Sequence, residues 1–225
     1  MQKNGVLQQG VDWTGYVTAL APVAVVLALM VLSISLLLSV DDAVRLKQLI
    51  EDDGPVQLVG QTCIALTFVI CLFYAVLDKE RRSSFLPLSY LLLFYTLREA
   101  DFHYKVSPFA KATQFKRFYS HEMIPLSTKL LMAAIVVLFL VVLFRYLKQE
   151  RAGFFLALRQ RLAWAVCALA WAGVFVMSQI VDQVPLFHNA SGQVIEEVFE
   201  SGAEVLALLA VILFRLELRR PSDEP

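Results

Sequence analysis

The absence of charge from long apolar stretches constrains this chain more than any other feature. Residues 13–40, 54–77 and 162–181 contain no Asp, Glu, Lys or Arg, and each stretch has at least the roughly 20 residues that a helix needs to cross a bilayer. The 225-residue chain is 58% hydrophobic and 18% charged, whereas soluble domains are about 45–50% apolar and about 25% charged. The sequence therefore predicts an all-α polytopic membrane protein.

Three further apolar segments contain charged residues. Arg98 interrupts the first of them, Lys129 the second, and Glu200 and Glu204 the third. With these segments we predict a single membrane domain over residues 1–225, a transmembrane helical bundle of about six spans at 14–40, 56–77, 83–101, 123–145, 162–183 and 196–215. The connections are too short to bury a core of their own. If segment 83–101 does not fully cross the membrane, the later spans are inverted.

Loop charges predict the orientation, because short cytoplasmic loops are enriched in Lys and Arg. Six spans place both termini and the 78–82 and 145–161 loops on one side, with twelve basic residues against seven on the other side. Both termini are therefore predicted to be cytoplasmic. The short loops favour a bacterial inner (plasma) membrane.

The charge balance and the cysteines exclude other classes. Twenty basic and twenty acidic residues give a formal net charge of zero, so no basic field exists to hold nucleic acid. The three cysteines lie in apolar stretches without CxxC spacing, which argues against a disulfide framework or a zinc knuckle.

Charged residues inside the predicted spans gather toward the outer leaflet. Each costs about 2.5–3.5 kcal/mol near a helix centre, so an intramembrane carboxylate is by default a functional-site hypothesis. Glu197, Glu200 and Glu204 have i, i+3 and i+7 spacing and share one helix face. Ser178, Gln179 and Asp182 lie at the outer end of the fifth span. These residues predict an outward-facing acidic site.

The residue types in this outer zone suggest three roles. Carboxylates and imidazoles suit a zinc or another divalent metal ion that activates water, with a glutamate as general base. The predicted catalytic residues are Glu200, Glu204 and Asp182; the predicted metal ligands are His103, His121 and Glu99; the predicted substrate-binding or headgroup-binding residues are Arg98, Lys129, Lys116 and Arg117.

The predicted outer loop 102–122 interleaves basic and aromatic residues. Such a segment is typical of a membrane interface, where aromatic rings lie at headgroup level and Lys or Arg reach phosphates. We expect it to lie on the outer leaflet over the mouth of the site. The bilayer is thus the expected partner and a lipid the hypothetical substrate.

Three functions remain open from the sequence. The first is metal-assisted hydrolysis or transfer on a lipid. The second is proton- or cation-coupled transport, in which Glu200 and Glu204 bind and release the ion. The third is a non-catalytic accessory subunit. A structural alternative is that the intramembrane charges form salt bridges that only fix helix packing.

Overall fold

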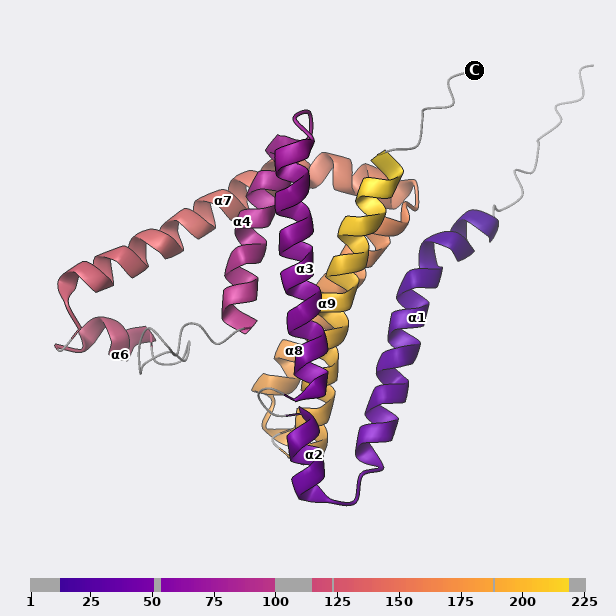
Figure 1. The fold of residues 1–225 in the computed structure, drawn as a ribbon, viewed down its shortest axis with the longest axis vertical. Helices are drawn as coiled ribbons and strands as arrows, with labels where there is room; N and C mark the ends of the chain where they lie inside the picture. The colour runs from indigo at the N-terminus through magenta and orange to yellow at the C-terminus, as the bar shows by residue number, and fades with distance from the viewer. Residues whose placement is uncertain (1–12, 51–53, 100–114, 123, 188, 219–225) are drawn as a thin grey trace, which may run out of the picture.

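The computed structural model describes residues 13–50, 54–99, 115–122, 124–187 and 189–218 (Figure 1). Every regular element in these ranges is helical, which confirms the all-α prediction. The elements are α1 (Trp13–Leu38), α2 (Ala43–Ile50), α3 (Pro55–Leu77), α4 (Arg82–Glu99), α6 (Phe115–Ser120), α7 (Leu126–Arg159), α8 (Ala163–Gln183), the 3-10 turn η2 (Pro185–Phe187) and α9 (Ala190–Leu218).

Helix boundaries differ from the sequence expectation at three places. The short helix α2 lies in a connection where no element was expected, and α7 continues to Arg159, through most of the segment that was expected to be a loop. Helix α9 begins at Ala190, where Asn189 accepts a hydrogen bond from the N–H of Gly192 (2.9 Å) in place of the missing helical partner. The glutamates of α9 are therefore further from its start than the sequence indicated.

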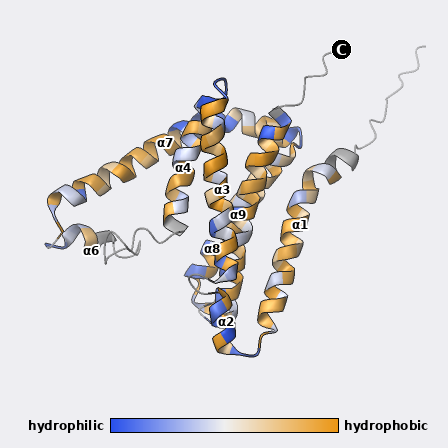
Figure 2. Ribbon diagram, viewed as in Figure 1, coloured by the Kyte–Doolittle hydropathy of each residue, from blue (hydrophilic) through white to orange (hydrophobic). Residues whose placement is uncertain are grey.

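Four described segments are long and apolar enough to cross a membrane: Val17–Leu38, Ala43–Leu77, Leu126–Arg159 and Ala163–Gln183. Large apolar side chains on their outer faces are exposed, for example Val31 (65%), Phe73 (58%) and Leu131 (61%). Figure 2 shows that hydrophobic residues continue along the length of α1, α3 and α7. Because a soluble monomer rarely exposes so much contiguous apolar surface, these helices are suited to a lipid environment.

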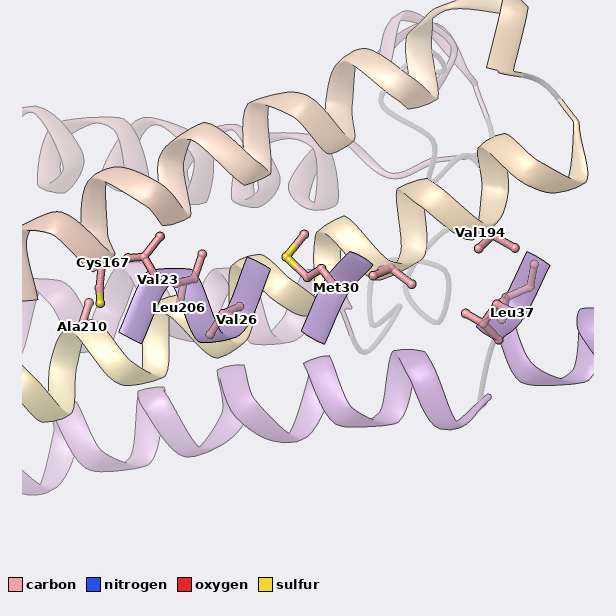
Figure 3. Packing of buried hydrophobic residues seen from close by; sticks show 10 residues of the cluster. Val23, Val26, Met30, Leu37, Cys167, Val194, Leu206 and Ala210 are labelled. Carbon is pink, nitrogen blue, oxygen red and sulfur yellow. The ribbon is translucent and has the colours of Figure 1, made fainter. Parts of the chain in front are cut away.

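Helix α9 is the central helix of the bundle. It packs along α8, α3 and α1, while α4 packs on α3. One hydrophobic core joins α1, α8 and α9 around Met30, Cys167 and Leu206 (Figure 3). A second core joins α3, α4 and α9 around Phe85 and Val211. Since α9 contributes to both cores, its side chains are held by three neighbouring helices.

Polar contacts link the helix ends near the α3–α4 turn. Arg215 near the end of α9 donates to Asp78 (2.8 Å) and lies over the ring of Tyr74, 5.2 Å from its centroid. Arg82 donates to the carbonyl of Ala75 (2.9 Å) in the last turn of α3, where helix carbonyls lack internal partners. These contacts fix the ends of α3, α4 and α9 relative to one another.

Helix α7 leaves the bundle obliquely. It contacts α4 and α8, and Figure 1 shows that its N-terminal half and α6 lie apart from α8 and α9. This divergence decides which of the expected site residues come together.

Candidate functional site

Glu204 is the middle residue of α9 and is 2% exposed. Its carboxylate lies against α3 at Gly60, where a Cβ would clash with Oε2 of Glu204 and would lie 3.1 Å from its Cδ. Glycine is thus required at position 60 for the carboxylate to approach the backbone of α3 so closely. The sequence places a charged group at the centre of the bundle and provides space for it on the facing helix.

The residues next to Glu204 fix α9 against two other helices. Ser201 donates its hydroxyl hydrogen to the carbonyl oxygen of Val56 (2.8 Å) in the first turn of α3. The Val56 carbonyl lies within α3, so the hydrogen bond from Ser201 is an additional link between α9 and α3. Gly202 allows the side chain of Met30 on α1 to pack against α9, since a Cβ there would clash with its sulfur.

Glu200 lies one turn before Glu204 and faces α8. Its Oε1 accepts hydrogen bonds from the Ser178 hydroxyl (3.2 Å) and from the Gln179 amide (3.1 Å). Ser178 is fully buried. The half-buried carboxylate of Glu200 thus receives two donors from α8.

Together these residues form what we call the α9 carboxylate cluster: Glu200 and Glu204 with Ser178, Gln179, Ser201 and Gly60. Two carboxylates one helical turn apart repel each other when both are charged, and an apolar interior offers little screening. Binding one proton or one small cation relieves this repulsion. The arrangement is therefore suited to reversible binding of a positive charge.

The remaining expected site residues lie elsewhere. Asp182 is exposed near the end of α8, where Gln183 donates to it (2.6 Å). His121 follows α6 and Lys129 lies in the first turn of α7, and both are half-buried. His103 and the side chains of Arg98, Glu99, Lys116 and Arg117 lie outside what the structure describes.

The structure thus unites only part of the expected site. Glu204 is buried in the bundle core and Glu200 lies one turn before it on α9. Helix α6, which precedes His121, and the start of α7, which bears Lys129, are apart from α8 and α9 (Figure 1). In the described ranges no three His, Cys, Asp or Glu side chains are arranged to hold a metal ion. Because His103 and the Glu99 side chain are outside these ranges, the zinc site stays a prediction.

Sequence reasoning named Ser178 and Gln179 as polar but gave them no role, and it missed Gly60 altogether. The small size of Gly60 could have indicated its role, because small residues on membrane helices mark places where another helix approaches closely. What no sequence pattern indicated was that the approaching group is a carboxylate.

Comparisons with known proteins provide no assignment: no family model, no curated protein and no solved structure matches this chain.

Proposed function

We propose that the chain is a six-span integral membrane protein in which α4 and α9 cross the bilayer together with the four most apolar segments. Helix α9 has 29 residues, about 44 Å at 1.5 Å per residue, and exceeds a hydrocarbon core of about 30 Å. It packs along α1, α3 and α8, three helices with the composition of membrane spans. A helix enclosed in this way crosses when its neighbours cross.

The arrangement of the helix ends supports the same topology. In Figure 1 the start of α1, the α3–α4 turn, the α7–α8 connection and the end of α9 lie at one end of the bundle. The basic segments 78–82 and 145–161 belong to this end, so we assign it to the cytoplasm. Both termini are cytoplasmic in this proposal.

Within this topology, the proposed function is proton- or cation-coupled transport through the α9 carboxylate cluster. The burial of Glu204 at the middle of the central helix is the observation that carries the proposal. Intramembrane carboxylates are costly, and in pumps and transporters they bind and relay protons or ions. In this proposal Glu200, which accepts hydrogen bonds from α8, is the second carboxylate that binds the transported ion.

Transport is favoured over metal-assisted lipid hydrolysis because of the placement of the site residues. Glu200 and Glu204 lie one turn apart on the central helix α9, whereas the elements next to His121 and Lys129 stand apart from α8 and α9. Proton or cation binding requires only the carboxylates and their hydrogen-bond donors. Transport therefore requires only residues that α9 and the adjacent part of α8 provide.

Ion flux in proteoliposomes tests this function. The purified chain is reconstituted with an internal dye that reports pH, Na⁺, K⁺ or Mg²⁺, and flux of the corresponding ion is driven by a membrane potential. We expect wild-type flux above that of protein-free liposomes for one of these ions. Glu204→Gln, which keeps the size of the side chain and removes its charge, should reduce the flux to background.

Glu80→Gln is the matched control, because Glu80 is exposed in the α3–α4 turn, so this variant should retain wild-type flux. Circular dichroism and size-exclusion profiles verify that both variants are folded. Wild-type flux equal to that of empty liposomes for every ion, or unchanged flux in Glu204→Gln, would contradict the proposal.

A further inference from the structure

A cavity of about 680 Å³ lies between α7 and the helices α4, α8 and α9. Its volume is within the range of about 300–1,000 Å³ that is typical of small-molecule sites. The cavity is separate from the α9 carboxylate cluster, none of whose residues line it. It lies beside the charged C-terminal part of α7.

The wall of the cavity is almost entirely apolar. Ala168, Ala172, Ala207 and Ala210 leave the space open, because their short side chains do not fill the gap between helices. Aromatic rings bound it, among them Trp164 on α8, which meets the ring of Phe214 on α9 edge to face. A wall of this kind suits a hydrocarbon chain.

The cavity extends along the helix axes. Its lining runs from Trp164 to Ala172 on α8 and from Ser84 to Leu92 on α4, which is about 12 Å of helix in each case. One end lies at the start of α4 and α8, at the proposed cytoplasmic face, and the other lies within the bundle. An acyl chain that enters from the cytoplasmic leaflet would run parallel to the long axis of the cavity.

Basic residues line the cavity together with this apolar wall. Lys148 and Arg151 are exposed and, across the described parts of the chain, neither forms a hydrogen bond or an ion pair. The acidic residue between them, Glu150, already accepts hydrogen bonds from Ser84 (2.8 Å) and Gln149 (3.0 Å). The two cations therefore provide positive charge for an external anion.

We propose that this cavity binds one anionic glycerophospholipid from the cytoplasmic leaflet, with an acyl chain between α7 and α8 and its phosphate at Lys148 and Arg151. The charge complementarity selects an anionic lipid, since basic pockets between membrane helices on the cytoplasmic side hold anionic headgroups. The apolar wall distinguishes the occupant from a soluble phosphate, which would leave that wall unfilled.

Tryptophan quenching by brominated lipids tests this site in the full chain. Trp164 and Trp171 line the cavity, and the third tryptophan is removed by Trp13→Phe. The protein is reconstituted in phosphatidylcholine, with increasing fractions of phosphatidylglycerol or phosphatidylcholine brominated on the acyl chain. Two cations near a membrane surface contribute about fivefold each, so half-maximal quenching should need about 25-fold less of the brominated anionic lipid.

Charge variants identify the residues that are responsible for the preference for the anionic lipid. Lys148→Ala with Arg151→Ala should bring the ratio between the two lipids close to one. Arg145→Ala with Arg159→Ala removes the same charge from exposed positions of α7 that do not line the cavity, and it should retain the preference. All four positions are exposed, so folding is preserved, as circular dichroism can verify.

A second variant tests occupancy of the apolar space. Ala168→Leu with Ala207→Leu fills the cavity and should reduce quenching by both lipids. The proposal is overturned if wild-type protein shows no preference for the anionic lipid, or if the preference survives the loss of Lys148 and Arg151. Equal loss of preference in both charge variants would also overturn it, because that result indicates diffuse surface attraction.

Discussion

At the scale of single residues, Glu204 and Gly60 have to be considered together. The carboxylate occupies the volume that any larger residue at position 60 would need. A buried charge is costly unless it is hydrogen-bonded, paired or neutralised. Its position against the α3 backbone therefore determines how closely α9 packs on α3.

This contact predicts that Gly60→Ala destabilises the protein. The added methyl group would clash with Oε2 of Glu204, and overpacking of this kind costs about 1–3 kcal/mol. Thermal unfolding of the detergent-solubilised protein measures the loss. In a Glu204→Ala background the clash is removed, so the cost of Gly60→Ala should become small.

Gly173→Ala on α8 is the matched control for this substitution. Among the described residues, no neighbouring group would lie within 4 Å of a Cβ at position 173. Alanine has a higher helix propensity than glycine by up to about 1 kcal/mol, so this variant should be as stable as wild type or more stable. An unchanged melting temperature in Gly60→Ala would contradict the close contact between the Glu204 carboxylate and the α3 backbone.

At the scale of helices, Glu200 links α9 to α8 through donors on one turn of α8. Gln179→Leu removes one of these donors and should cost about 0.6 kcal/mol and at most about 1.7 kcal/mol, the average and the maximum for interhelical hydrogen bonds measured in a membrane protein. Gln183→Leu, one turn further along α8 at an exposed position, should have a smaller effect. Unfolding measurements compare the two variants, and equal losses would indicate that the bond to Glu200 contributes no stability.

The helices were the part of the fold that sequence could predict. Uncharged stretches determine α1, α3 and α8, because the hydrophobic pattern alone decides where such helices form. The divergence of α7 could not be predicted, since it depends on packing between distant segments. For the same reason, spacing placed Glu200 and Glu204 on one face of a helix but could not identify Gly60 as the neighbour of Glu204.

At the scale of the whole molecule, the charged side chains divide between the two ends of the bundle. The end at the α3–α4 turn contains the Arg215–Asp78 ion pair and the two cations, Lys148 and Arg151, that line the cavity beside α7. The carboxylates lie at mid-length of α9 and toward its N-terminal end. Such a division has functional meaning only if the helices cross the membrane in the proposed order, which makes topology the decisive measurement.

Single cysteines in a cysteine-free background test that order through an impermeant maleimide applied to cells that express the full chain. The exposed positions Asp41 and Leu186 should be labelled from outside, whereas Glu80, Gln160 and Ser222 should be labelled only after the membrane is permeabilised. If α4 does not cross, the later helices invert, so Gln160 is labelled in intact cells and Leu186 is protected. If α9 does not cross, Ser222 is labelled together with Leu186. Either pattern would contradict the six-span topology, because the proposal requires both α4 and α9 to cross alongside the four segments whose composition already suits the bilayer.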